Sequence, residues 1–243
     1  MSGGQRALAG ILFAIILAVT VDPAAGQAPD IRTFVHRIYI EGVPYEEAAR
    51  FDPAASVPIL LDMLADPKEA DYWPNIVVTL GMLGDERAVD PLIQFLQQGA
   101  TAPLSHPQYI AKSSVVMALG YIVNKSGSEK ALQFLVESTD PEVWTRRDIK
   151  WSSPYHSTEV ERNRQLTIMS VLGLGLSGDP RAARVLRSLR QAPATPQAKN
   201  LRAQIPDVGD VLKDALQANQ KIAKTGMADY YRQRFPKPLP GTK

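Results

Sequence analysis

Candidate binding residues concentrate in one segment of the chain, residues 139–163. Its aromatic and arginine residues are Trp144, Arg146, Arg147, Trp151 and Tyr155. Such side chains are enriched at the energetic centres of protein interfaces, and loops on a rigid scaffold often carry function. The alternative is that the tryptophans fill the gap that an insertion leaves between packed helices. The sequence gives these two interpretations equal weight.

A second group of candidate binding residues consists of arginines near the C-terminal end of the sequence. Apolar residues at helical spacing after Asp179 predict a helix with one buried stripe, and three arginines lie mostly outside that stripe. They are Arg184, Arg187 and Arg190. Arginine can bind a carboxylate through two hydrogen bonds, which suits an acidic protein, glycan or lipid headgroup. An ordinary solvated helix face is the alternative interpretation.

The charge of the chain is unevenly distributed along the sequence. The 243 residues contain 27 Lys and Arg against 25 Asp and Glu, a net charge of +2. Residues 1–96 carry 6 basic and 13 acidic residues, a net charge of −7, and residues 97–180 carry 8 of each. Residues 181–243 carry 13 basic and 4 acidic residues, a net charge of +9. This gradient predicts a protein or peptide partner with an acidic surface, bound through the C-terminal half and weakened by salt.

Residue types that perform catalysis or bind metal ions are few and scattered. The sequence has no cysteine, which excludes thiol chemistry, disulfides, zinc fingers and iron–sulfur clusters. Its three histidines, His36, His106 and His156, lie far apart, and none forms a metal-binding pair at i, i+4. The glycine fingerprints of nucleotide-binding loops and the GxSxG motif are missing. We therefore expect no catalytic site, no metal site and no cofactor.

The first 26 residues have the three parts of a secretory signal. Arg6 precedes the apolar run 7–21, and small residues follow at Ala24 and Gly26, which predicts cleavage after Gly26 and a mature chain beginning at Gln27. An uncleaved anchor helix is less favoured, because spanning a bilayer takes about 20 apolar residues. The expected location is the periplasm or the medium. Contact with a membrane would then be transient, through the signal alone, and nucleic acid is not an expected partner.

Four stretches of the remaining sequence resemble one another. Residues 75–96 and 165–189 each contain an apolar segment, a Leu-Gly pair, a second glycine, Asp-x-Arg-Ala and another apolar segment. Residues 113–135 form a third copy with Ser128 in place of the aspartate, and residues 45–64 form a degenerate fourth. Each copy carries apolar stripes that one hairpin cannot bury alone. The repeat therefore predicts helical hairpins that stack on one another.

The glycines and aspartates of the repeat have predicted structural positions. Three glycines within helical segments each cost about 1 kcal/mol of helix propensity, which indicates that neighbouring helices approach closely there. They are Gly81, Gly120 and Gly173. Gly84 and Gly178 stand where a helix would end in a left-handed residue. Asp85 and Asp179 follow them, where a carboxylate can accept hydrogen bonds from the free amides of the next helix.

The stretch LGMLGDERAVDPLIQFL, residues 80–96, resembles the HEAT-like repeat of the type first described in phycobilisome lyase subunits. Residues 172–189 resemble it more loosely, and the resemblance covers roughly residues 45–189. It implies a right-handed superhelix of antiparallel helix pairs. It also implies structural positions at the turns for Asp85, Arg87, Asp179 and Arg181. Members of this family are mostly interaction scaffolds, and a minority are subunits of chromophore lyases.

These observations predict an all-α fold, an α-solenoid or superhelix of about four HEAT-like helical hairpins in residues 27–192. Residues 193–206, rich in Ala, Pro and Gln, predict a linker. Residues 207–226 predict a C-terminal capping helix that starts at Asp207 and ends at Gly226, and residues 227–243 predict a flexible tail.

The predicted function is that of an exported, non-enzymatic scaffold that mediates protein–protein interaction. One alternative is a lyase-type or enzyme-accessory subunit, which only the resemblance to phycobilisome lyase proteins supports. Such a lyase would act on cytoplasmic antenna proteins, whereas the N-terminal segment predicts export. A purely structural component of the cell envelope is the other alternative.

Overall fold

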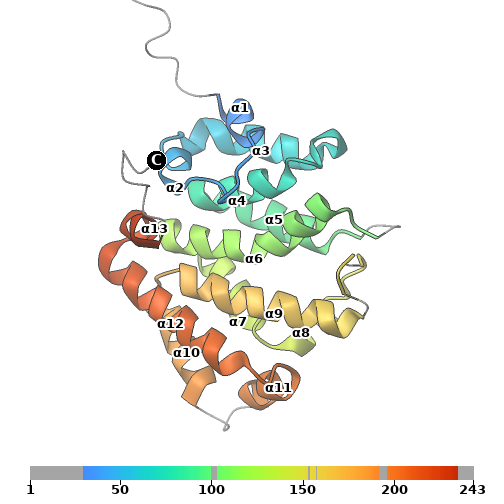
Figure 1. The fold of residues 1–243 in the computed structure, drawn as a ribbon, viewed down its shortest axis with the longest axis vertical. Coiled ribbons are helices and arrows are strands. Elements are labelled where there is room, and N and C mark those ends of the chain that lie inside the picture. The colour runs from blue at the N-terminus through green and yellow to red at the C-terminus, as the bar shows by residue number, and fades with distance from the viewer. Residues whose placement is uncertain (1–29, 100–102, 153, 157, 192–195, 235–243) are drawn as a thin grey trace, which may run out of the picture.

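The computed structural model describes residues 30–99, 103–152, 154–156, 158–191 and 196–234, and every regular element among them is helical (Figure 1). The all-α class is therefore confirmed. The predicted signal, residues 1–26, lies outside the described residues, as do residues 193–195 and 235–243. The helices are α1 (Ile31–Val35), α2 (Tyr45–Ala48), α3 (Pro53–Ala65), α4 (Trp73–Leu83), α5 (Val89–Gln97), α6 (His106–Ser126), α7 (Glu129–Glu137), α8 (Pro141–Arg146), α9 (Glu159–Leu176), α10 (Pro180–Gln191), α11 (Pro196–Gln204), α12 (Val208–Thr225) and α13 (Met227–Arg234), with short 3₁₀ helices η1 (Pro67–Glu69) and η2 (Glu86–Ala88).

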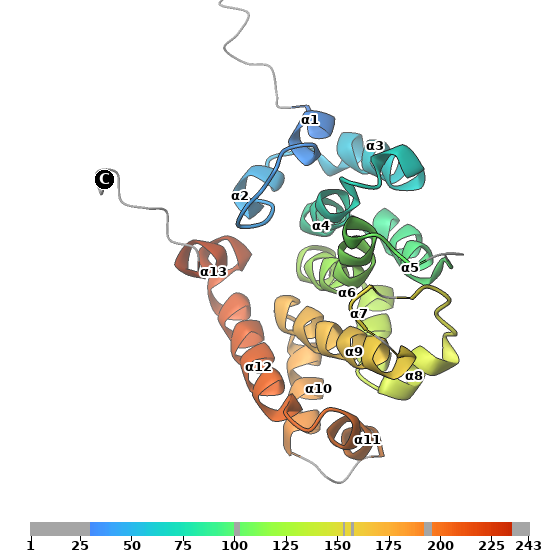
Figure 2. The same ribbon diagram turned by 45° about the vertical axis from the view of Figure 1, so that its right-hand side comes forward.

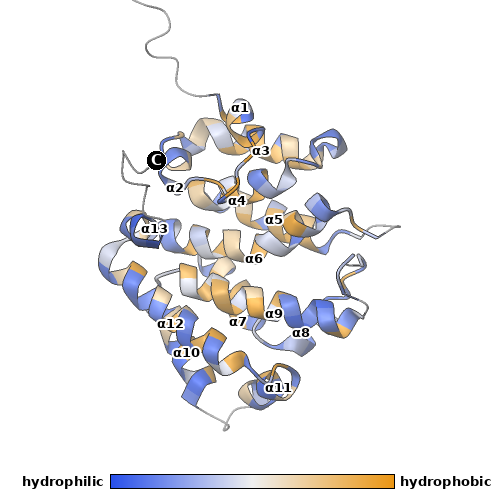
Figure 3. Ribbon diagram, in the orientation of Figure 1, coloured by the Kyte–Doolittle hydropathy of each residue, from blue (hydrophilic) through white to orange (hydrophobic). Residues whose placement is uncertain are grey.

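Three of the predicted repeats form helical hairpins, α4 with α5, α6 with α7, and α9 with α10. The first helices of these hairpins pack in chain order, α4 on α6 and α6 on α9, and α12 continues the row against α9 (Figure 2). The second helices pack behind this row, α5 on α6, α7 on α9 and α10 on α12. Hydrophobic residues of α4, α5 and α9 lie among the packed helices (Figure 3). Each hairpin therefore buries its apolar stripes against its neighbours.

Glycines mark the closest approaches within the row of first helices, as the repeat predicts. A Cβ atom on Gly81 would lie 2.6 Å from Cα of Ala118 on α6. One on Gly120 would collide with the backbone of Gly173 on α9, and one on Gly175 would lie 2.9 Å from the carbonyl oxygen of Ala215 on α12. Since side chains would force these helices apart, the glycines set the spacing of the row.

The helix ends at the hairpin turns also agree with the sequence. Gly84 ends α4 with φ of 71°, and Gly178 precedes α10 with φ of 59°. Only glycine adopts this left-handed conformation without strain. The third copy has Gly127 with φ of 73° at the same place, so its hairpin closes in the same way although Ser128 replaces the aspartate.

Two predictions for the C-terminal part are wrong. Residues 196–204 form α11 where a linker is predicted, and residues 227–234 form α13 where a flexible tail is predicted. The reason is burial: Ala198, Leu201 and Ile205 are buried at helical spacing within a stretch rich in Ala, Pro and Gln. Met227 and Tyr230 are buried in α13. Residues 208–225 form α12, in agreement with the helix predicted over 207–226, although α13 follows it.

Helix α13 returns to the N-terminal part of the chain. The ring of Tyr231 stacks on that of Tyr45 in α2, with centroids 5.3 Å apart and planes inclined by 3°. Arg232 forms an ion pair with Glu46 at 2.6 Å. The chain thus brings its last described helix against one of its first. None of the described helices is both long and apolar enough to cross a membrane.

Candidate functional site

The two tryptophans of residues 139–163 are structural. Both side chains are fully buried, with 0% of their surface exposed. The indole nitrogen of Trp144 donates to the carbonyl oxygen of Ser138 at 3.1 Å, and that of Trp151 donates to the carbonyl oxygen of Leu96 at 2.7 Å. The assignment of Trp144 and Trp151 as partner-binding residues is therefore wrong, and the alternative, that they fill a gap between helices, is correct.

The remaining candidates of this segment divide between interior and surface. Arg147 lies with its guanidinium carbon 3.9 Å from the ring centroid of Phe134 and donates to Ser138 Oγ and to Glu137. Burial lowers the pKa of Arg147, so this side chain belongs to the packing of the segment. Arg146 and Tyr155 are exposed. Arg146 pairs with Asp140 and Glu142, and Tyr155 contacts His106.

Arg162 is a buried residue that the sequence analysis missed. It lies in the first turn of α9, and its guanidinium donates to the carbonyl oxygens of Ile149 at 3.0 Å and Trp151 at 2.7 Å. It also donates to Oδ1 of Asn163. A signal was available, because Arg162 stands four residues before Leu166 on the apolar face of the helix. These hydrogen bonds fix the irregular residues 149–152 against α9.

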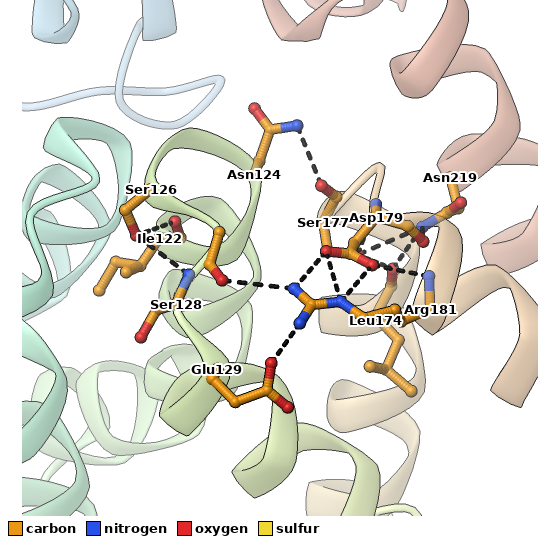
Figure 4. A network of polar contacts seen from close by, with 11 residues as sticks. Ile122, Asn124, Ser126, Ser128, Glu129, Leu174, Ser177, Asp179, Arg181 and Asn219 are labelled. Carbon is orange, nitrogen blue, oxygen red and sulfur yellow. Dashed lines mark hydrogen bonds and ion pairs between the residues drawn. The ribbon is translucent and has the colours of Figure 1, made fainter.

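The Asp-x-Arg step at residues 179–181 joins its hairpin turn to the preceding hairpin (Figure 4). Asp179 accepts from the backbone nitrogen of Arg181 at 2.6 Å and from its guanidinium at 2.7 Å. The same guanidinium donates to the carbonyl oxygen of Gly127 at 3.3 Å and pairs with Glu129. The residues assigned to repeat turns therefore form contacts between neighbouring repeats.

The earlier turns repeat this arrangement with one variation. Asp85 accepts from Arg87, whose guanidinium donates to the carbonyl oxygen of Pro53 at 3.2 Å. In the third copy Lys130 takes the position of the arginine and pairs with Asp90 of the preceding hairpin at 2.5 Å. A basic side chain thus reaches back from each of these three turns.

Two buried or half-buried asparagines complete the turn 177–179, and sequence reasoning missed both. Asn219 on α12 donates to the carbonyl oxygen of Leu174 at 3.0 Å and to Ser177 Oγ at 3.2 Å. Asn124 on α6 donates to the carbonyl oxygen of Ser177 at 3.0 Å (Figure 4). Carbonyl groups at the end of α9 therefore receive side-chain donors from both neighbouring helices, α6 and α12.

The Asp179→Asn variant is expected to show a pH-dependent loss of stability. Hydrogen bonds from the side chain and backbone of Arg181 hold the pKa of Asp179 below its usual value of 3.8. A carboxylate with a lowered pKa stabilises the fold above the unfolded value, and this contribution is lost as pH falls through the folded pKa. We expect urea denaturation at pH 7 to show a loss of up to about 1 kcal/mol in unfolding free energy, because the amide can still accept the backbone hydrogen bond but carries no charge opposite Arg181.

The loss should shrink as the pH is lowered below about 4. Asp62→Asn, at an exposed aspartate on α3, is the matched control and should leave stability nearly unchanged at both pH values. An equal deficit of Asp179→Asn at pH 7 and pH 3 would contradict the role of the carboxylate charge.

The arginines of α10 lie on the surface, as predicted. Arg184, Arg187 and Arg190 are exposed, whereas Ala182, Leu186 and Leu189 on the same helix are buried. Lys199 and Arg202 on α11 are exposed as well, and residues 180–204 contain no Asp or Glu. We call the exposed residues Arg184, Arg187, Arg190, Lys199 and Arg202 the basic surface.

The basic surface carries charge that the described part of the chain does not neutralise. None of its five cations takes part in an ion pair among the described residues, in contrast to Arg87, Arg181 and Arg232. Arg187 donates to the carbonyl oxygen of Ala183, and Arg202 to that of Arg190. The surface lies at the end of the molecule opposite to α1 and α3 (Figure 1).

The three histidines lie apart from one another and contact acidic or aromatic side chains. His36 lies 2.7 Å from Glu69, His106 contacts Tyr155, and His156 lies against the ring of Tyr109. Within the described ranges, no three His, Cys, Asp or Glu side chains are grouped so that they could hold a metal ion.

The fold and these turns define a class of protein, an all-α protein built from helical hairpins that pack in chain order. The model of the PBS lyase HEAT-like repeat matches residues 75–98, which contain most of α4 and all of η2 and α5. The chain therefore carries a HEAT-like repeat of this type, as the sequence predicts. A comparison with curated proteins gave no significant match.

Proposed function

We propose that this protein is an exported, non-enzymatic scaffold, a HEAT-like solenoid that binds an acidic protein partner through its basic surface. The HEAT-like repeat at residues 75–98 and the packed hairpins support a scaffold. The basic n-region, apolar run and small residues of 1–26 support export. The observation that carries the proposed interaction is the group of exposed, unneutralised cations on α10 and α11.

The chemistry of the basic surface favours a partner rich in carboxylates. Arg184, Arg187 and Arg190 repeat every third residue on one exposed part of α10, and each guanidinium can bind a carboxylate through two hydrogen bonds. Surface charges of one sign accelerate the approach of an oppositely charged partner, and salt weakens this effect. The scaffold therefore binds fastest at low ionic strength.

Replacing Arg184, Arg187 and Arg190 together by Gln should slow partner association. The partner is first identified by mass spectrometry among proteins that co-purify with the wild type from its native host. Surface plasmon resonance then measures the association rate, which we expect to fall on the order of tenfold at low salt and less at physiological salt. Helicity by circular dichroism should not change, because the three side chains lie outside the buried stripe.

The matched control replaces three exposed cations elsewhere, Lys68, Arg164 and Lys224, by Gln and so removes the same total charge. It should retain most of the wild-type association rate. If the α10 variant and this control associate at the same rate, the basic surface is a solvated helix face and the proposed interaction site is wrong.

A further inference from the structure

A groove apart from the basic surface lies between the row of first helices and the C-terminal helices. It has a volume of about 630 Å³, within the range of small-molecule sites. Helices α4, α6 and α9 form one wall, and α12 and α13 form the other (Figure 2). Among the apolar residues that line it are Val78, Met82, Met117, Leu172, Leu176 and Ala218.

Two cations at one corner of this groove contact the same side chain, that of Tyr230. Lys221 on α12 places its ammonium nitrogen 5.9 Å from the ring centroid of Tyr230, and Arg234 at the end of α13 donates to the Tyr230 hydroxyl at 3.0 Å. Both line the groove and are exposed. In the part of the chain that the structure describes, neither forms an ion pair with a carboxylate. This corner is therefore suited to an anion.

The acidic residues of the lining leave room for such an anion. Asp214 precedes Lys221 by seven residues on α12, which separates the two by about 10 Å along the helix axis. Ala218 lies between them, on the same face of the helix. Glu41 enters the lining from the loop before α2 and makes no ion pair with Lys221 or Arg234. The groove thus combines a cationic corner with an apolar trough.

We propose that this groove binds a long-chain carboxylate, with the carboxylate group at Lys221 and Arg234 and the acyl chain along the apolar trough. Guanidinium and ammonium groups form charge-assisted hydrogen bonds with a carboxylate. Methionine side chains such as Met82 and Met117 adapt to flexible apolar ligands. Burial of methylene groups drives the chain into the trough.

An extended peptide fits this trough less well than an acyl chain. A peptide backbone carries one donor and one acceptor at most residues, and each must find a partner when it is buried. The lining offers few such partners: apart from the tyrosines, its uncharged polar residues are Ser114 and Gln217, beside Met117, Leu172 and Ala218. The Tyr121 hydroxyl is already bonded to that of Tyr231. An acyl chain has no polar groups to satisfy.

The test uses dansyl-undecanoic acid, a fluorescent long-chain carboxylate, and its methyl ester. We expect saturable binding of the acid to the purified protein, and weaker binding of the ester on the order of tenfold, because the ester cannot form the charged hydrogen bonds. Dodecanoate should displace the probe better than octanoate or dodecanol. Binding to the apolar run 7–21 cancels in every comparison between variants, because all of them retain it.

Variants locate the site. Lys221→Gln combined with Arg234→Gln should weaken the acid on the order of tenfold and leave the ester unchanged. Lys224→Gln, on α12 outside the groove, is the matched control and should bind like wild type. Ala218→Phe should fill the trough and weaken acid and ester alike, whereas Ala223→Phe, on an exposed part of the same helix, should weaken neither.

The proposal is overturned if acid and ester bind equally, or if the paired Gln variant and Lys224→Gln give the same affinity. It is also overturned if the acid does not bind. Binding of an acidic apolar peptide that Ala218→Phe weakens would then make the groove a peptide site. None of these outcomes bears on the basic surface, because the arginines of α10 do not line the groove. Failure here and failure of the proposed scaffold interaction are thus separately visible.

Discussion

Gly173→Ala is expected to lower the free energy of unfolding by about 3 kcal/mol. A Cβ atom at this position would lie 2.5 Å from the carbonyl oxygen of Val116 and 3.0 Å from Cδ2 of Leu135. The first neighbour is backbone and cannot rotate away, so α6 and α9 must separate. Alanine gains about 1 kcal/mol over glycine in helix propensity, which offsets only part of this cost.

Thermal and urea denaturation measure this effect. For a protein of this size a loss of 3 kcal/mol corresponds to a decrease in Tm of roughly 6–12 °C. Gly209→Ala is the matched control, since Gly209 lies in α12 and a Cβ atom there would meet nothing within 4 Å. It should raise stability by up to about 1 kcal/mol. If Gly173→Ala proved as stable as wild type, the glycines would not set the helix spacing.

The close helix approaches could be predicted because their signal is local. A glycine within an apolar helical segment is costly unless a neighbour needs the space, so Gly81, Gly120 and Gly173 identified the contacts of the row without knowledge of their partners. The left-handed turns at Gly84 and Gly178 could likewise be predicted, because an aspartate directly follows each glycine. Apolar periodicity and turn-forming residues are signals that span only a few positions, so both could be identified from the sequence.

Helix α13 could not be predicted, because its stabilising partners are distant in sequence. Arg232 pairs with Glu46, which lies 186 residues earlier, and Tyr231 stacks on Tyr45. The segment itself is short and polar, and a short helix is marginal without tertiary contacts. The same reasoning applies to the groove, since its lining combines residues of α4, α6 and α9 with residues of α12 and α13 that lie far from most of them in sequence.

The burial of the two insertion tryptophans was also beyond the sequence. Aromatic residues near arginines are common both in interfaces and in packed interiors, and composition does not distinguish these environments. Trp151 is buried because Leu96 on α5 accepts its indole hydrogen and Arg162 on α9 holds the backbone beside it. Those partners lie in separate repeats.

Arg162→Met is expected to destabilise the protein by about 2–4 kcal/mol. Methionine keeps a long, unbranched side chain that can pack in the same space. It has no hydrogen-bond donor, so it leaves the carbonyl oxygens of Ile149 and Trp151 without their donor. Burial lowers the pKa of Arg162, and the hydrogen bonds to two carbonyl groups and to Asn163 compensate its charge. Arg164→Met, at an exposed arginine of the same helix, should change stability by less than about 0.5 kcal/mol.

Hydrogen exchange distinguishes a local effect of Arg162→Met from general weakening. Arg162 donates to the backbone of residues 149 and 151. Its removal should therefore open residues 149–152 before the helical hairpins unfold. We expect faster exchange in this segment and at the Trp151 indole than at α4 or α6. Uniformly faster exchange, or a stability equal to that of Arg164→Met, would contradict this. A local opening would also expose the Trp151 indole, which is fully buried in the closed fold.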